Sequence, residues 1–176
     1  MKLPWISLVV LPLLTSVVLT TAQAQSVEPP LKFENFPVSQ IYKGTPAIVN
    51  LNSNPEARRF RGVLGDGAKE GPNFAGHYTV VLWGCGTGCQ SLAIVNAKTG
   101  AVYMTGLSAE VGAKFQIDSK LLVINPPENM TEGYGSNKPD WLTSRYYVWE
   151  NNRLVQIYPP KSERSPVSQG LYKVRS

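Results

Sequence analysis

The residues able to do thiol or imidazole chemistry lie in one short stretch of the chain. His77 is the only histidine, Cys85 and Cys89 are the only cysteines, and all three fall within residues 77–89. Such a set could form a structural disulfide, a redox-active thiol pair, a zinc site or a Cys–His nucleophile. Which of these is possible depends on the local structure that positions the three side chains.

A β-hairpin is the structure that this stretch predicts. Residues 77–84 and 90–96 are rich in β-branched and aromatic side chains, and Gly86-Thr87-Gly88 forms a three-residue loop between them, with Gly88 in the left-handed position. The expected cross-strand pairs are Cys85 with Cys89, Trp83 with Ser91, Val81 with Ala93, and Thr79 with Val95. Opposed cysteines lie within or near the Cα separation of about 4.4–6.8 Å that a disulfide tolerates. We therefore expect a structural disulfide between Cys85 and Cys89 at the hairpin tip.

The same hairpin separates His77 from the cysteines. The extended strand from His77 to Cys85 spans about 26 Å, whereas zinc ligation or a Cys–His pair needs direct contact. We therefore expect no metal and no cofactor. A redox role for the cysteine pair is an alternative, although the Cys-x-x-x-Cys spacing differs from the two-residue spacing of common oxidoreductases.

A tight bend over residues 71–76 is expected to lead the chain into the hairpin. Asn73 in this bend is expected to cap backbone groups with its side chain. His77, at the start of the first strand, is expected to be a hydrogen-bonded structural residue rather than a catalyst. If His77 is functional instead, its partner must come from another strand or from a ligand.

The N-terminus predicts a signal peptide over residues 1–24. Lys2 provides a positive charge, an apolar stretch follows, and Ala22 and Ala24 form the small-residue pattern that a signal peptidase requires. The apolar stretch is too short and too interrupted for a comfortable span of roughly 20 residues, and retention as an N-terminal anchor is the alternative. We expect an exported protein, periplasmic or secreted, with no stable membrane span after cleavage.

The chain that remains after cleavage, about 150 residues, has the size of one domain. We expect a partly disordered leader over 25–45, a single β-rich domain over 46–158 and a flexible tail over 159–176. Loss of Lys2 lowers the formal net charge from +5 to +4. Because this basic excess is small and spread along the chain, we expect no nucleic-acid partner.

The pattern of apolar residues predicts a mainly β fold, an antiparallel meander sheet of about six to eight strands with one N-terminal helix packed on it. Asn54 is the expected N-cap of that helix, and Gly65 and Gly67 are expected to end it. Two further hairpins are expected over 114–125 and 141–158.

The first hairpin is apolar on both faces, which is typical of a pair of strands covered on both sides. We expect the helix to cover one face, and a second sheet, loops or a partner to cover the other. The candidates for this second cover are Trp141, Tyr146, Tyr147 and Trp149.

Two motifs of this region resemble a signature of small exported bacterial proteins of unknown function. They are Gly71-Pro-Asn-Phe-Ala-Gly-His-Tyr78 and Trp83-Gly-Cys-Gly-Thr-Gly-Cys-Gln90, and the resemblance extends over roughly 54–103. It implies a bacterial envelope protein in the periplasm, and it implies no particular activity.

We therefore predict a non-catalytic envelope protein whose partner is an unknown protein or an envelope ligand. The expected contact surface is Gly86-Thr87-Gly88, and the long loop over 126–140, with Tyr134 near its middle, is a second candidate. The alternative is a hydrolase or thiol-redox enzyme that uses His77 or the cysteine pair. The sequence carries no indication of the oligomeric state.

Overall fold

The structure is a computed structural model that describes residues 31–159. The predicted signal peptide lies outside the described residues, as do the first residues of the predicted leader and residues 160–176 of the predicted tail. Within residues 31–159, no helix is both long enough and apolar enough to cross a bilayer.

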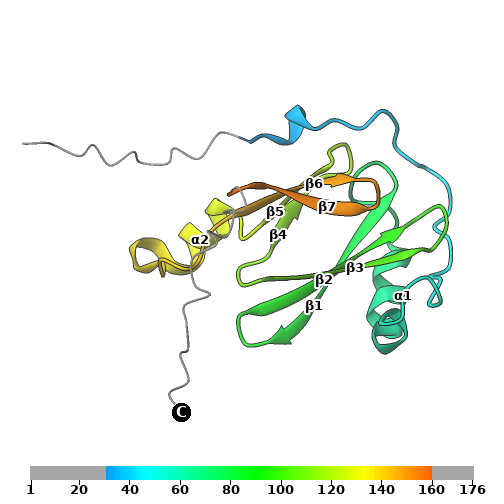
Figure 1. Ribbon diagram of the computed structural model, residues 1–176, viewed down its shortest axis with the longest axis horizontal. Helices are drawn as coiled ribbons and strands as arrows, with labels where there is room; N and C mark the ends of the chain where they lie inside the picture. Colours follow the sequence, from blue (N-terminus) through cyan, green and yellow to red (C-terminus); the bar gives the residue numbers. More distant parts are fainter. Residues whose placement is uncertain (1–30, 160–176) are drawn as a thin grey trace, which may run out of the picture. The chain divides into compact units, whose positions relative to one another are not determined.

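Two antiparallel sheets make up most of the described chain (Figure 1). The first sheet has three strands in the order β1 (Tyr78–Gly86), β2 (Cys89–Asn96) and β3 (Val102–Ala109). The second has four, in the order β4 (Ala113–Phe115), β5 (Leu121–Ile124), β6 (Arg145–Glu150) and β7 (Arg153–Tyr158). The mainly β, antiparallel fold is confirmed, whereas the prediction of one continuous meander sheet is wrong.

The chain leaves the first sheet at the turn between β3 and β4. Gly112 in this turn has a φ of 95°, a left-handed conformation that glycine adopts readily. Beyond the turn, β4 pairs with β5 and not with β3. The meander is therefore divided into two sheets, each of which runs in sequence order.

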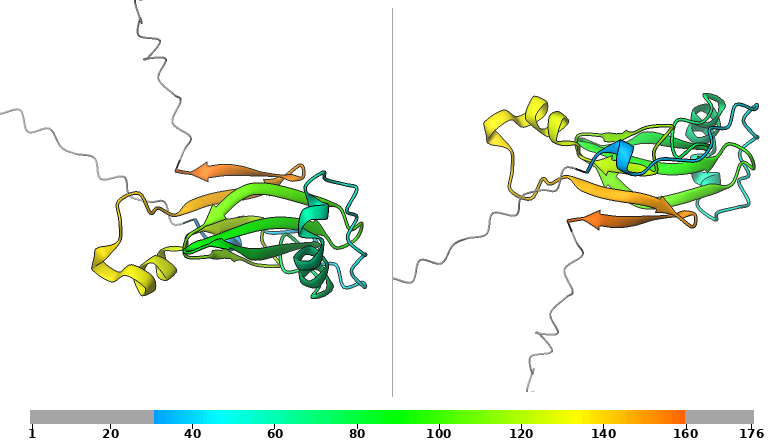
Figure 2. Two further views of the ribbon diagram at one scale, coloured as in Figure 1. Left: turned by 90° about the horizontal axis from the view of Figure 1, so that it is seen from below. Right: turned by 90° about the horizontal axis from the view of Figure 1, so that it is seen from above.

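The two sheets pack face to face and enclose the main apolar core, as the two layers in Figure 2 show. Tyr147 and Trp149 of β6 lie in this core, so two of the four aromatic residues expected to cover the hairpin do so. Tyr146 lies on the opposite face of β6, because neighbouring residues of a strand alternate, and Trp141 is 67 % exposed. Phe33 in the short 3-10 helix η1 (Phe33–Asn35) packs on the outer face of the second sheet.

The predicted helix covers the other face of the first sheet. It consists of a 3-10 turn, η2 (Ala57–Phe60), followed by α1 (Arg61–Lys69), and its buried Leu64 packs in a cluster with Val81 of β1. The helix was expected to end near Gly65 and Gly67, and it continues through both glycines to Lys69. A Cβ on Gly67 would lie 2.7 Å from a methyl group of Val81, so this glycine allows the helix to approach the strand closely.

A second helix lies where the long loop over 126–140 was predicted, so the prediction of a single helix is also wrong. This helix, α2 (Pro127–Tyr134), is followed by the 3-10 turn η3 (Gly135–Asn137). Pro127 occupies one of the first helical positions, Glu128 lies in the first turn, and Met130 is buried.

The two further predicted hairpins are confirmed. β4 pairs with β5, and β6 pairs with β7 through a turn at Asn151 and Asn152, whose φ angles are 49° and 59°. Asparagine tolerates this left-handed conformation better than most residues do.

Candidate functional site

The tip of the β1–β2 hairpin carries the predicted disulfide. Cys85 and Cys89 are bonded, with their Cα atoms 5.2 Å apart. The register along the strands is also as expected, since Trp83 pairs with Ser91, Val81 with Ala93, and Thr79 with Val95.

The tip itself differs from the predicted three-residue loop. Gly86, and not Cys85, is the partner of Cys89, so that Cys85 is an extra residue in a bulge. The loop is shortened to Thr87 and Gly88. Glycine accounts for the difference, because Gly86 has a φ of 141° that L side chains rarely adopt. Gly88 takes the expected left-handed conformation, with a φ of 60°.

The tip lies outside the apolar core. The burial of β1 decreases along the strand, from its buried first residues to exposed residues at 84–86, and Thr87 and Gly88 are exposed as well. A Cβ added to Gly84, Gly86 or Gly88 would meet nothing within 4 Å. The disulfide therefore constrains a loop that side-chain packing does not hold.

An open hollow of about 520 Å³ lies beside the tip. The tip, the β3–β4 turn and α2 all contribute to its lining, which consists of Gly84, Gly86, Gly88, Cys89, Gln90, Glu110, Val111, Gly112 and Asn129. The structure thus brings the first predicted contact surface together with the segment over 126–140 that was the second candidate. It does so through Asn129, whereas Tyr134, which is 36 % exposed, does not line the hollow.

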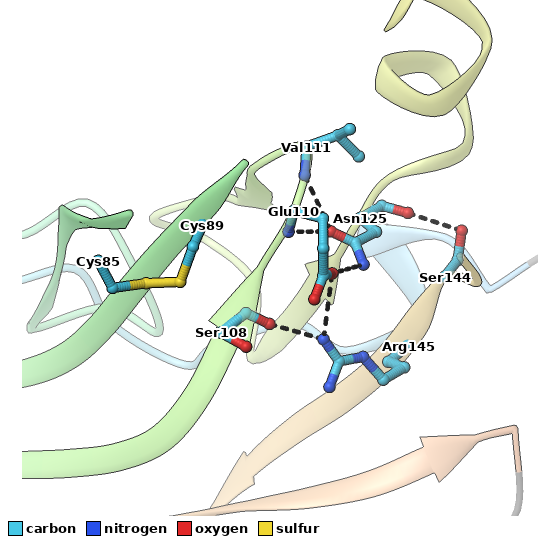
Figure 3. Close-up of polar contacts among 8 residues, drawn as sticks. All are labelled: Cys85, Cys89, Ser108, Glu110, Val111, Asn125, Ser144 and Arg145. Carbon is cyan, nitrogen blue, oxygen red and sulfur yellow. Dashed lines mark hydrogen bonds and ion pairs between the residues drawn. A yellow bond between two sulfur atoms is a disulfide. The ribbon is translucent and has the colours of Figure 1, made fainter. Parts of the chain in front are cut away.

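Asn125 holds one wall of this hollow in place (Figure 3). Its Oδ1 accepts hydrogen bonds from the backbone N–H groups of Glu110 (2.8 Å) and Val111 (3.2 Å), and its Nδ2 donates to the Glu110 carboxylate. Ser144 Oγ donates to the Asn125 carbonyl oxygen at 2.8 Å. Two buried side chains therefore make the connection: that of Asn125 ties the β3–β4 turn to the end of β5, and that of Ser144 ties the end of β5 to the segment before β6.

Two further side chains complete the wall. Arg145 Nη2 donates to the carbonyl oxygen of Ser108 at 2.6 Å and lies 3.7 Å from Glu110 Oε2. Asn129 Nδ2 donates to the Val111 carbonyl oxygen at 2.7 Å and thereby attaches α2 to the same turn. The sequence analysis missed this cluster, although an asparagine directly after an apolar strand and before two prolines was a signal for a fixed turn.

His77 lies at the opposite end of β1, in the turn that precedes the strand. Its half-buried ring is 4.2 Å from the ring of Tyr78, and its imidazole forms no hydrogen bond with residues 31–159, so the prediction of a hydrogen-bonded histidine is wrong. Burial lowers the pKa of His77 below its ordinary value of 6.5, and the nearby Lys98 lowers the pKa further. Both effects favour the neutral ring near pH 7.

An open hollow of about 630 Å³ adjoins His77, and Lys120 and Glu150 also line it. Glu150 is exposed and does not contribute to the pKa shift of His77. The hollow thus contains a histidine, a lysine and a carboxylate, but nothing in the described chain orients the imidazole as a catalytic base requires.

Asn73 is engaged with the backbone of the first strand. Its Oδ1 accepts a hydrogen bond from Val80 N at 2.8 Å, and its Nδ2 donates to Val80 O at 3.2 Å. Because β1 is an edge strand, this amide occupies backbone groups that would otherwise face solvent.

The cysteine sulfurs are bonded to each other, and nowhere in residues 31–159 do three or more His, Cys, Asp or Glu side chains form a group that could hold a metal ion. Comparisons of the chain with protein-family models, with curated proteins and with solved structures give no match. The resemblance to small exported bacterial proteins stays a prediction, and the function has to be argued from the geometry of the site.

Proposed function

We propose that this chain is an exported envelope protein that acts as a non-catalytic binding module and contacts its partner through the disulfide-clamped tip and the adjoining hollow. One observation carries the proposal. An exposed hairpin tip whose glycines have open space beside them is held by a covalent bond, next to a hollow whose opposite wall is held by the Asn125 cluster.

The tip and the adjoining hollow form a rigid surface, and rigidity favours binding. A loop that is already ordered loses less conformational entropy when a partner binds, so more of the contact energy appears as affinity. The disulfide restricts the tip, and the hydrogen bonds of Asn125 and Asn129 restrict the facing turn and α2.

The chemistry of the hollow favours a polypeptide partner. Gly84, Gly86 and Gly88 leave the backbone of the tip accessible, since they carry no side chains that would cover it. The amide side chains of Gln90 and Asn129 lie above Gly112, where an added Cβ would be 3.7 Å and 3.3 Å from them. Backbone groups and amides donate and accept hydrogen bonds, as an extended peptide does.

Export to the periplasm or beyond is part of the proposal. The predicted signal peptide supports it, and so does the disulfide, because disulfides persist in oxidising compartments. Non-reducing mass spectrometry of the protein from its native compartment tests this point. We expect one disulfide and an N-terminus at Gln25, whereas two free thiols or an intact N-terminus would contradict it.

The binding proposal is tested by affinity capture from envelope extracts. We expect Thr87→Arg to abolish capture of the partner, because the arginine would project from the exposed tip. Thr99→Arg is the matched control, since Thr99 is also an exposed threonine before a glycine in a hairpin turn, at the other end of β2. Equal capture by both variants would contradict the proposal.

A second candidate is hydrolysis at the hollow beside His77, which its neutral imidazole and the nearby Glu150 favour. In that case His77→Gln would abolish turnover of the substrate and leave partner capture unchanged. A thiol-redox role of the cysteine pair would instead require that Cys85→Ser removes a measurable disulfide-exchange activity.

A further inference from the structure

A further groove, separate from the tip, lies between β3 and β7. These strands contact each other at one side of the sandwich (Figure 1). The groove adjoins the hollow beside His77, since Trp149 and Asn152 line both. The groove has a volume of about 670 Å³, which is within the range of about 300–1,000 Å³ that is typical of small-ligand sites. Residues of β3, β6, β7 and the segment before η2 line it.

The floor of the groove is apolar. Tyr147 and Trp149 are almost fully buried there, so their ring faces are not free for a sugar to stack on. Tyr103, Leu107 and Leu154 are only partly buried and present apolar surface at the side of the core. This floor fits an aliphatic chain better than a carbohydrate.

Arg153, Asn152 and Tyr103 supply hydrogen-bond donors to the lining. Gln156 supplies an acceptor, because its Nε2 donates to the Pro159 carbonyl oxygen at 2.8 Å while its Oε1 has no partner in residues 31–159. The Arg153 guanidinium forms no ion pair or hydrogen bond with residues 31–159, and the lining contains no Asp or Glu. The Oδ1 of Asn152 already accepts a hydrogen bond from Tyr78 at 2.9 Å, which leaves its amide N–H groups to donate. Burial raises the pKa of Tyr103, and this keeps its hydroxyl protonated and able to donate as well.

The carboxylate of Glu150, opposite Arg153 on β6, does not line the groove. Glu150 is the cross-strand partner of Arg153, but its side chain lines the hollow beside His77 and is not within ion-pair distance of the guanidinium. The positive charge is therefore available to a ligand in the groove, and an anion would be the complementary occupant.

We propose that the groove between β3 and β7 binds a free single-chain fatty acid. The aliphatic chain lies on Tyr103, Leu107 and Leu154, and the carboxylate accepts hydrogen bonds from Arg153 and Asn152. The groove shares no lining residue with the hollow at the tip, so this proposal is independent of the proposed partner binding.

Calorimetric titration of the exported protein with dodecanoate, below the concentration at which micelles form, tests the inference. We expect saturable binding of one dodecanoate per chain, and about tenfold or weaker binding for Arg153→Gln. Arg59→Gln, which removes an exposed arginine outside the groove, is the matched control and is expected to bind like the wild type. Far-UV circular dichroism establishes that each variant is folded.

Two further ligands and one mapping experiment sharpen the test. Dodecyltrimethylammonium, which has the same chain and a cationic head, is expected not to bind, and neither are phosphatidylglycerol vesicles. Amide shifts in NMR spectra with dodecanoate are expected at residues 103–107 and 152–156. Absence of dodecanoate binding, equal binding of the cationic ligand, preference for the vesicles, unchanged affinity of Arg153→Gln, or shifts confined to other residues would overturn the proposal.

Discussion

The two ends of the β1–β2 hairpin are held in place by different means. At the base, backbone hydrogen bonds tie the chain to its neighbours, from Tyr42 N to Gly76 O, from Gly76 N to Ile117 O, and from Ala97 N to His77 O. At the tip, a disulfide joins two residues beside exposed glycines, and a Cβ added to any of these glycines would meet nothing within 4 Å. The backbone is paired at both ends, but only the base is also packed into the core, and at the tip a covalent bond takes the place of that packing.

The two ends of the hairpin also differ in how accessible they are to a partner. The base is built into the core and the tip projects from it, so the tip is free to contact a partner without disturbing the fold. Residues that are close in the sequence, His77 and the cysteines, are consequently separated by the length of a strand.

The largest expected effect is a difference in lost stability between glycine substitutions at the base and at the tip of the hairpin. Gly76 and Gly88 both have positive φ angles, but a Cβ on Gly76 would lie 2.3 Å from Gln40 O, whereas one on Gly88 would meet nothing. We expect Gly76→Ala to lower the free energy of unfolding by about 3 kcal/mol and Gly88→Ala by about 1 kcal/mol. Urea denaturation measures both, and equal losses would mean that the base is no more constrained than the tip.

The next effect concerns the covalent bond. Replacing both cysteines, Cys85→Ser with Cys89→Ser, is expected to lower the free energy of unfolding by no more than about 2 kcal/mol, because the disulfide closes a short loop. Capture of the partner by this variant is expected to fall strongly, because the tip loses its fixed conformation. Global unfolding of the variant would show that the disulfide supports the core, and would contradict the conclusion that it holds only the tip.

A smaller loss of stability is expected when the Asn73 side chain, which is bonded to the edge strand β1, is removed. Asn73→Ala removes both side-chain hydrogen bonds to the Val80 backbone and is expected to lower the free energy of unfolding by about 1 kcal/mol. Asn137→Ala, at an exposed position in η3, serves as the control and is expected to change stability by less than about 0.5 kcal/mol. Partner capture should be unaffected by either change.

The smallest expected effect is a pH dependence of the free energy of unfolding, caused by His77 at the base of the hairpin. Because the pKa of His77 is lower in the folded protein than the ordinary 6.5, the unfolded chain binds the proton more readily. The free energy of unfolding should therefore decrease as the pH falls through 6.5, and His77→Gln should remove this decrease. The imidazole signals of the only histidine in the chain can be followed directly by NMR, and a pKa above 6.5 would contradict the account.

The sequence was sufficient for features that depend on neighbouring residues. The hairpin register below the tip, the disulfide and the Asn151-Asn152 turn follow from local patterns, and the structure confirms each of them, whereas the predicted pairing of Cys85 with Cys89 across the strands is wrong. The bulge at Cys85 was not predicted, because it depends on the conformation that Gly86 adopts among several that glycine allows.

Features that depend on contacts between distant segments could not be predicted. The two sheets separate at the β3–β4 turn, which is held in its fixed shape by hydrogen bonds to Asn125 at the end of β5. No local pattern in the sequence shows that Asn125 contacts this turn. Helix α2 is too short for an apolar repeat to reveal it. For the same reason the sequence located the tip but not the facing wall of the hollow, to which Glu110 and Asn129 contribute.

Site-specific photo-cross-linking tests the central claim, that the tip and its hollow form the contact surface. A photoactivatable side chain would be placed in turn at Thr87 in the tip, at Asn129 in α2 and at Thr99 in the β2–β3 turn, and each variant irradiated with envelope extract. We expect the same cross-linked partner from Thr87 and Asn129 and none from Thr99. A partner that cross-links from Thr99 and from neither of the other two positions would contradict the account.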